Sequence, residues 1–278
     1  MKFKIVTDSC CDLTDKMKVD NHVEIAPLTL QLDEKIYIDD ENLDVKDYIK
    51  AMRECPIAPK TACPSPQEFI ERYKGDETIF GVTISKELSG TYNSAVLAKD
   101  IYLEVEGTKF IHIFNSRSAS VGESLIALKI GELAKKGYSS DQIVSEVEQY
   151  IEGMNTFFLL ESLTHLAKAG RLNPVIAKIA SVLSLKPIMG ATEDGTIKLV
   201  HKVRGYNKAF NKLVDTIGEH GNDFSDKTLA ISYCNCPERA EAFKMECQTR
   251  YNFKDIIIVE MGGLSSTYAD EGGIIISF

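Results

Sequence analysis

Serine, glycine and threonine follow one another at Ser89, Gly90 and Thr91, between an apolar run typical of a buried strand and a segment with helical spacing. Backbone N–H groups at a helix start lack intrahelical acceptors, and the helix dipole makes that end positive. Hydroxyls beside it add donors, so this turn is suited to holding a carboxylate or phosphate without a metal ion. The same residues are also ordinary helix caps, and local spacing alone favours that simpler interpretation.

Two further segments carry polar groups that suit an anion. Thr61 lies in a loop stiffened by prolines, just before a predicted helix, and can present one more hydroxyl. Arg171 follows a glycine typical of a helix C-terminus, where a guanidinium can bind a carboxylate with two parallel hydrogen bonds. Each segment has an ordinary alternative, because the first can be a polar loop with a cap and the second a solvated surface arginine.

A glycine-rich stretch near the C-terminus, residues 261–273, places hydroxyl groups between glycines. Glycines on both sides of such side chains indicate a close approach of the backbone to another group. Thr267 and Tyr268 lie at its centre, and we treat both as candidates for contact with a ligand.

Signatures of common enzyme classes are missing from the sequence. It has no G-x-S-x-G nucleophile elbow, no G-x-x-x-x-G-K-S/T phosphate loop and no H-E-x-x-H zinc motif. Its five histidines show no ligand spacing, and no candidate base lies near Ser89 in sequence. We therefore expect a protein that binds its ligand without converting it. A hydrolase or transferase that uses Ser89 on an anionic ester or phosphate stays the alternative.

The seven cysteines form no disulfide or metal pattern. Their number is odd, and Cys10–Cys11 and Cys234–Cys236 lack the C-x-x-C spacing of zinc and redox sites. Thiols that pack as small apolar groups in a reducing cytoplasm are the favoured interpretation, and we predict no metal site. The acidic run Asp39–Glu41 is compatible with a hard cation, but a solvated turn is favoured there.

Composition argues against several classes of partner. The 278 residues suffice for one large domain or two smaller ones, and 32 basic against 41 acidic side chains give a formal net charge of −9. An acidic surface repels nucleic acid and anionic membrane faces, so we expect neither as a partner. The N-terminus has no apolar signal segment, and no run approaches the roughly 18 apolar residues of a membrane span. We expect a cytoplasmic protein.

Apolar runs alternate with helical segments through residues 1–153, which we predict to be a first domain. Strand–helix alternation favours a mainly parallel sheet with helices on its faces. Strands are expected at 3–7, 24–32, 78–84 and 109–114. Helices are expected at 45–53, 66–74, 92–105 and 139–153, and a further helix follows the strand at 109–114 and ends at 134.

Residues 154–278 predict a second α/β domain with a mixed sheet. Residues 186–200 are typical of two strands joined by an Asp-Gly hairpin turn. Further strands are expected at 227–234, 255–261 and 273–278, and helices at 159–169, 174–185, 206–220 and 237–251.

These segments, in their order along the chain, resemble the DegV family. Residues 6–12 (VTDSCCD) are similar to the family's opening T-D-S-x-x-D, and residues 60–65 (KTACPS) to its K-T-S-Q-P-S loop. Residues 88–95 (LSGTYNSA) match L-S-G-T-Y-Q-S-A closely. Residues 115–122 (NSRSASVG) resemble D-S-x-x-x-S-x-G, and residues 166–172 (LAKAGRL) resemble L-K-K-G-G-R-I. Each motif is short, but five in this order are specific.

The resemblance implies two α/β domains that enclose a long-chain fatty acid between or within them, and no cofactor besides this ligand. In the family, the loop threonine and the serine of L-S-G-T hold the carboxylate, and these roles map onto Thr61 and Ser89. The family arginine maps onto Arg171, near the head group. A separate kinase subunit, the fatty acid kinase catalytic subunit, then phosphorylates the exposed carboxylate. The apolar segment 175–183 is a candidate tunnel wall, although its own pattern is that of a core helix.

The C-terminal segment departs from the family pattern. The family often reads G-T-H-T-G-P-G where residues 266–272 read STYADEG. Tyr268 therefore stands where a histidine is usual, and it can donate a hydrogen bond but supplies no positive charge. Asp270 and Glu271 add negative charge beside it. A stand-alone lipid sensor or buffer is for this reason an alternative to a kinase substrate carrier.

Overall fold

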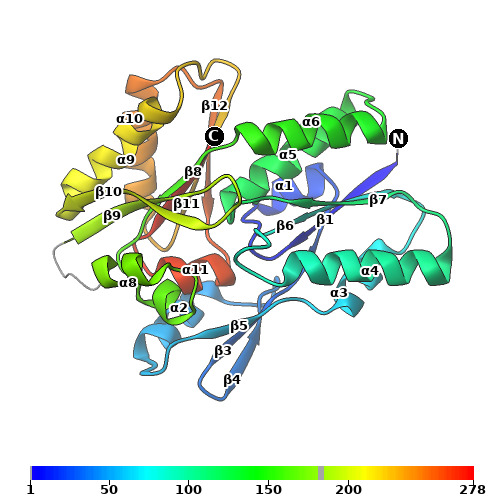
Figure 1. Ribbon diagram of the computed structural model, residues 1–278, viewed down its shortest axis with the longest axis horizontal. Coiled ribbons are helices and arrows are strands. Elements are labelled where there is room, and N and C mark those ends of the chain that lie inside the picture. The colour runs from blue at the N-terminus through cyan, green and yellow to red at the C-terminus, as the bar shows by residue number, and fades with distance from the viewer. Residues whose placement is uncertain (1, 181–184) are drawn as a thin grey trace.

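Residues 2–180 and 185–278 are described by a computed structural model (Figure 1). Within these ranges the chain forms a parallel sheet of four strands, a mixed sheet of six and a small antiparallel sheet of three. The α/β class predicted from the sequence is confirmed. No helix in the described ranges has the length and apolar character needed to cross a bilayer.

The four-stranded sheet comes from the first half of the chain and has helices on both faces. Its parallel strands, in the order β2-β1-β6-β7, are β1 (Phe3–Asp8), β2 (Val23–Ala26), β6 (Thr78–Thr83) and β7 (Ile111–Asn115). One apolar cluster joins it to α5 (Val121–Lys135) and α6 (Ser140–Gly153), with α1 (Asp15–Asp20) nearby. A second cluster joins the opposite face to α3 (Pro66–Tyr73) and α4 (Thr91–Glu106).

The six-stranded sheet comes from the second half, and only one of its pairings, β11 with β12, is parallel. Its order is β10-β9-β8-β13-β11-β12. Helices α9 (Tyr206–His220) and α10 (Pro237–Arg250) pack against it in the largest apolar cluster. The strands are β8 (Thr156–Leu159), β9 (Leu185–Ala191), β10 (Ile197–Arg204), β11 (Thr228–Tyr233), β12 (Asp255–Glu260) and β13 (Ile274–Ser277).

Helix α5 connects the two large sheets. Besides its contacts with the first sheet, Val121 and Leu125 pack against Ala230 and Val259 of the second. A helix between two sheets must be apolar on nearly all sides, and α5 accordingly has buried residues around its whole circumference. The position of this helix fixes how the loops at the ends of both sheets approach each other.

The small sheet contains Thr61, which lies in strand β5 and not in the loop predicted from the sequence. Strands β3 (Thr29–Leu32), β4 (Lys35–Ile38) and β5 (Lys60–Ala62) pair antiparallel in the order β4-β3-β5. Helix α2 (Val45–Glu54) packs with α11 (Gly263–Ala269), a helix from the far end of the chain. The short helices α7 (Thr164–Lys168) and α8 (Pro174–Ala180) complete the fold.

Several predicted elements differ from the structure. The helix predicted at 159–169 is wrong, because Thr156–Leu159 is strand β8 and the helix there spans only Thr164–Lys168. A short apolar run has the same pattern in a fully buried strand as in a core helix, and β8 is a central strand. The stretch 24–32 divides at Pro27 into strands of two different sheets. The helix predicted at 174–185 is described only to Ala180, and residues 181–184 lie outside the described ranges.

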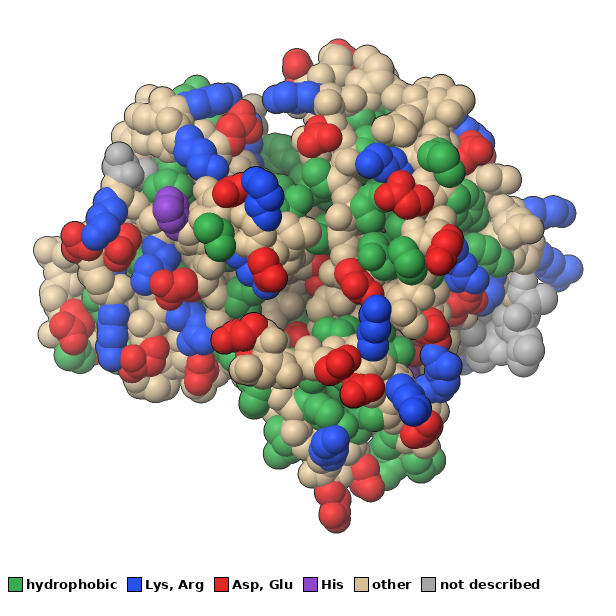
Figure 2. All heavy atoms as spheres, turned by 180° about the vertical axis from the view of Figure 1, so that it is seen from behind, with side chains coloured by type: hydrophobic (Ala, Val, Ile, Leu, Met, Phe, Trp, Pro, Cys, Tyr) green, Lys and Arg blue, Asp and Glu red, His purple; other side chains and the backbone are tan. Residues whose placement is uncertain are grey.

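The described surface mixes charges of both signs. On the face seen in Figure 2, Asp and Glu side chains alternate with Lys and Arg side chains over all parts of the fold. All strands of the six-stranded sheet follow residue 154, and those of the other two sheets precede residue 153. The division into domains at this point stays a prediction.

Candidate functional site

An apolar cavity of about 350 Å³ lies where loops from the three sheets meet. Its size falls within the roughly 300–1,000 Å³ typical of small-molecule sites. The loops after β5, β6 and β7 contribute to its wall, together with β8, the β9–β10 hairpin, α7 and α11. Apolar side chains cover most of the interior, among them Phe158, Leu160, Leu166, Ile197 and Ile275. Such a cavity suits an elongated apolar ligand.

Five of the six predicted site residues line this one cavity, namely Thr61, Ser89, Gly90, Arg171 and Tyr268. The hydroxyls of Thr61 and Tyr268 lie 2.8 Å apart and form a hydrogen bond. These two side chains come from β5 and α11, which are distant in sequence. The fold thus brings these two hydroxyl groups together on the wall of an apolar cavity.

Ser89 lies directly before the N-terminus of α4, a helix that Gly90 caps without a side-chain hydrogen bond. Its hydroxyl oxygen lies 2.8 Å from the Thr91 hydroxyl and accepts a bond from the Thr91 N–H at 3.3 Å. The N–H groups of Gly90, Tyr92 and Asn93 have no acceptor among the described residues. Ser89 is therefore not the N-cap residue that the simpler interpretation predicted, because Gly90 holds that position; its hydroxyl satisfies only the Thr91 N–H and leaves other donors of this turn free.

Arg171 is exposed and connects the end of α7 to the loop before α4. Its Nε donates to the Leu88 carbonyl at 2.8 Å, and Nη1 donates to the Ala169 carbonyl at 2.5 Å. A guanidinium has five N–H donors, so others remain for an anion at the cavity. Arg171 is thus held in place by the backbone.

Thr267 does not line the cavity. Its side chain is fully buried, donates to the Gly263 carbonyl at 2.7 Å and lies 2.8 Å from the Tyr48 hydroxyl. Burial raises the pKa of Tyr48 to about 12, so this hydroxyl stays neutral. The structure places Thr267 where it joins α11 to α2, beside Tyr268 but away from the cavity.

Asp39 was predicted to belong to a solvated turn, and for this residue the prediction is wrong. Asp39 is buried, and its carboxylate accepts hydrogen bonds from the N–H groups of Gly263 at 2.9 Å and Leu264 at 2.8 Å. It therefore satisfies the free donors at the start of α11, the helix that carries Tyr268. Glu41, in the same acidic run, is exposed.

Residues 174–178 of α8 do not line the cavity, although the segment 175–183 was considered as a tunnel wall. Ile176 and Ala177 instead pack at the edge of an apolar cluster around Leu166 and Met189. Residues 181–183 of that segment lie outside the described ranges.

His165 is a neighbour of the site that the sequence did not reveal. Its Nδ1 lies 3.0 Å from the Thr267 carbonyl oxygen and 3.2 Å from Asp270 Oδ1, so it connects α7 to the end of α11. The hydrogen bond that His165 donates to the Asp270 carboxylate raises the pKa of His165, and the Coulombic attraction adds to this effect. The imidazole itself does not line the cavity.

The raised pKa of His165 predicts a pH-dependent stability. The contribution of the His165–Asp270 pair to folding stability should be complete below the unfolded-state pKa of His165, about 6.5. It should be lost as the pH rises through the higher pKa of His165 in the folded protein. We expect Asp270→Asn to lower the melting temperature more at about pH 6 than at about pH 9. Thermal unfolding of both proteins across this range checks it. A deficit independent of pH, or a His165→Gln variant with the wild-type profile, would contradict the assignment.

These features define an α/β protein with an apolar cavity that is bordered by hydroxyl groups and by the residues before a helix N-terminus. The family model described as "Uncharacterised protein, DegV family" matches residues 2–278. The chain belongs to the DegV family.

Curated and solved relatives cover nearly the whole chain. A DegV domain-containing protein of Streptococcus gordonii is 32% identical over 100% of this chain and 99% of its own length. A DegV family crystal structure from Ruminococcus gnavus, described with vaccenic acid, is 43% identical with a TM-score of 0.95 and 99% coverage of both chains. The Streptococcus pneumoniae fatty acid kinase B3 protein loaded with linoleic acid is 31% identical, with a TM-score of 0.92, over 100% of this chain and 99% of that one.

Proposed function

We propose that the protein binds one long-chain fatty acid, with the carboxylate at Thr61, Ser89 and the N-terminus of α4 and the acyl chain in the cavity. The observation that carries this proposal is a single apolar cavity whose wall includes hydroxyls from distant elements, with those of Thr61 and Tyr268 hydrogen-bonded to each other and Ser89 lining the same space. The fatty acids named for the relatives from Ruminococcus gnavus and Streptococcus pneumoniae support it.

The energetics of such a site divide between tail and head group. Burying an acyl chain contributes about 0.8 kcal/mol per CH₂, so a dozen methylenes contribute roughly 10 kcal/mol before the costs of ordering the ligand. A hydrogen bond to a charged group contributes roughly 1.5–3 kcal/mol, so two or three donors are enough to fix the carboxylate. The tail therefore supplies most of the affinity, and the hydroxyls supply orientation.

Contacts of Ser89 favour binding over conversion. Among the described residues, the Ser89 hydroxyl contacts the Thr91 side chain and backbone but no histidine, carboxylate or lysine. A serine nucleophile needs a base within hydrogen-bonding reach to remove its proton. The hydrolase or transferase alternative thus lacks its general base in this geometry.

We further propose that the bound carboxylate is presented to a separate fatty acid kinase catalytic subunit. Gly90 and Arg171 line the cavity and are exposed, which supports a head-group end near the surface. Similarity to a fatty acid kinase B3 protein supports this role. We expect a bacterial kinase subunit to form acyl phosphate from ATP only when the lipid-loaded protein is added. Lipid binding with no phosphorylation by such subunits would favour the sensor or buffer alternative.

Native mass spectrometry of the protein purified from a bacterial host tests the binding itself. We expect a mass increase equal to one fatty acid per chain, and the same fatty acid after organic extraction. Ala119→Phe, which adds a ring at the cavity wall, should abolish the adduct while the protein stays folded. Val19→Phe, at an exposed position outside the cavity, is the matched control and should keep it. A lipid-free wild type that also fails to bind added oleate would refute the proposal.

A further inference from the structure

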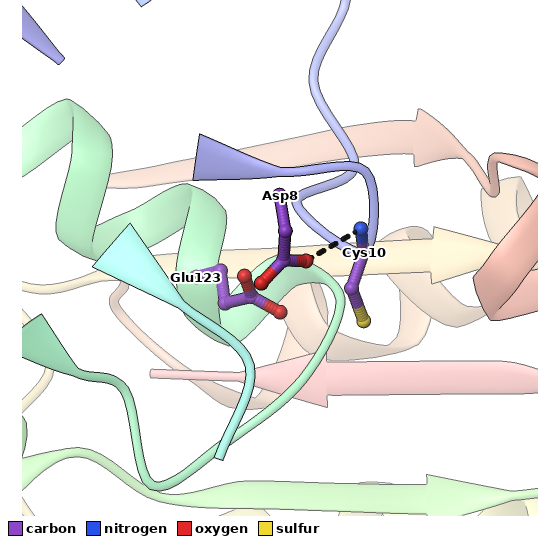
Figure 3. A group of neighbouring side chains, drawn as sticks. All are labelled: Asp8, Cys10 and Glu123. Atoms are coloured by element: carbon purple, nitrogen blue, oxygen red, sulfur yellow. Dashed lines mark hydrogen bonds between the residues drawn. The ribbon is translucent and has the colours of Figure 1, made fainter. Parts of the chain in front are cut away.

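Three buried side chains with metal-ligating atoms meet behind the cavity wall. Asp8 ends β1, Cys10 lies in the turn that follows, and Glu123 belongs to the first turn of α5. One ligand atom from each lies within 4.8 Å of the other two. Figure 3 shows the carboxylates of Asp8 and Glu123 next to each other, with Cys10 projecting from the turn beside them.

Glu123 carries the inference because its carboxylate has no partner. The residue is 0% exposed, and neither side-chain oxygen forms a hydrogen bond of regular geometry with a described residue. The Cys10 thiol and the Ser120 N–H are close enough to act on the carboxylate, but burial still raises the pKa of Glu123 well above its ordinary value. Burying an unpaired carboxylate is costly, and a native structure keeps such a group only for a reason. The neighbouring Asp8 carboxylate carries charge of the same sign, so it does not compensate the charge of Glu123. The missing partner must therefore be positive or donate protons.

The surroundings prepare the other two side chains to act as ligands. The Asp8 carboxylate accepts the N–H groups of Cys10 at 2.9 Å and Ile84 at 2.8 Å, which fixes its direction and leaves lone pairs free. The Ser120 N–H donates to Cys10 Sγ at 3.3 Å. A bond of this kind orients a metal ligand. Burial raises the pKa of the Cys10 thiol well above its ordinary value, so the thiolate forms only when a bound cation displaces the proton.

No cationic side chain compensates the cluster. Among the described residues, neither Asp8 nor Glu123 forms an ion pair with a lysine, arginine or histidine. Asp12, a further buried carboxylate of the same turn, instead accepts the Gly262 N–H at 2.7 Å. A divalent cation would neutralise most of this buried negative charge.

We propose that Asp8, Cys10 and Glu123 bind a divalent cation of the zinc class. Zinc accepts thiolate and carboxylate ligands together, whereas magnesium and calcium prefer oxygen ligands alone. With bonds of about 2.3 Å to sulfur and about 2.0–2.2 Å to oxygen in a tetrahedral arrangement, two ligands of one ion lie roughly 3.4–3.6 Å apart. The three ligand atoms lie within 4.8 Å of one another, so binding an ion would draw them together by up to roughly 1.4 Å.

The cation joins the first sheet to α5, and its site lies directly against the lipid cavity. Cys10 and Ser120 both line the cavity, which gives an ion and a water ligand a path to the cluster. The sequence-based expectation of no metal site rested on the spacing of Cys10 and Cys11. Glu123 follows far along the chain, so no local motif could reveal it. This inference does not depend on the proposed lipid.

Metal analysis of protein purified without chelator or histidine tag, followed by cobalt substitution, tests the site. We expect about one zinc per chain and, with cobalt, a thiolate-to-metal charge-transfer absorption. Glu123→Gln and Cys10→Ser should weaken zinc binding beyond the roughly 10–100-fold typical of outer-shell changes. Cys55→Ser, a cysteine outside the cluster, should keep the absorption band and the stoichiometry.

Three outcomes would overturn the proposal. Absence of saturable zinc or cobalt binding by the wild type would mean that protons alone neutralise the cluster. An absorption band that persists in Cys10→Ser would place the metal at another thiol. Glu123→Gln keeps the side-chain volume and removes a buried charge, so it should fold even if Cys10→Ser does not. Equal zinc affinity of folded Glu123→Gln and wild type would also overturn the site.

Discussion

Replacing both Thr61 and Ser89 by alanine is expected to weaken fatty-acid binding by roughly 2–4 kcal/mol, about 30- to 700-fold in Kd. Each hydroxyl supplies one hydrogen bond to a charged carboxylate, and the two come from separate elements that line the same cavity. The apolar walls are untouched by these changes. The variant should therefore still gain affinity with each added methylene, while its affinity at every chain length is lower.

Calorimetric titration of delipidated protein with fatty acids of increasing length separates these two contributions. Thr61→Ser and Ser89→Thr keep a hydroxyl at each position and are the matched controls, with affinities close to that of the wild type. The corresponding fatty alcohol, which lacks the charge, should lose much less affinity in the alanine variant. Unchanged fatty-acid affinity in the double variant would remove Thr61 and Ser89 from the head-group site.

Elements with a strong local pattern could be predicted from the sequence. Ser65 and Pro66 indicated the start of a helix, and in α3 the Ser65 hydroxyl accepts the Glu68 N–H at 3.3 Å. The Asp-Gly turn near Gly195 predicted the β9–β10 hairpin, and these strands do pair antiparallel. Caps and hairpin turns are decided by neighbouring residues, which a sequence displays directly.

Elements that depend on distant partners could not be predicted in the same way. Strand β5 has three residues and forms only because it pairs with β3, and α11 starts where Asp39 accepts its first N–H groups. Neither Asp39 nor Gly263 has a neighbour in sequence that reveals this contact. The candidate site shows the same limit, since Thr61 and Tyr268 were each identified by family resemblance while their mutual hydrogen bond required the fold.

Asp39→Ala is expected to lower the free energy of unfolding by about 2–4 kcal/mol, because it leaves two buried N–H groups of α11 without an acceptor. The free energy of unfolding of Asp39→Asn should lie between those of Asp39→Ala and the wild type. The amide oxygen can accept one of the two N–H groups, while the NH₂ group would face the other donor. Because α11 carries Tyr268, whose hydroxyl contacts Thr61, both variants should also bind fatty acid more weakly. Denaturant unfolding and titration measure the two effects.

The same contact can be tested from the helix side. A Cβ atom at Gly263 would lie 2.5 Å from Asp39 Oδ1 and 2.5 Å from a Leu43 methyl group, so Gly263→Ala must displace the carboxylate or the helix. We expect it to destabilise the protein by an amount similar to Asp39→Ala, and the double variant to cost less than the sum. Asp40→Ala, whose side chain accepts only the nearby Asn42 N–H, is the control and should be nearly neutral. Additive losses would mean that the two residues act independently, and α11 would then owe its position to its apolar contacts with α2 instead of to Asp39.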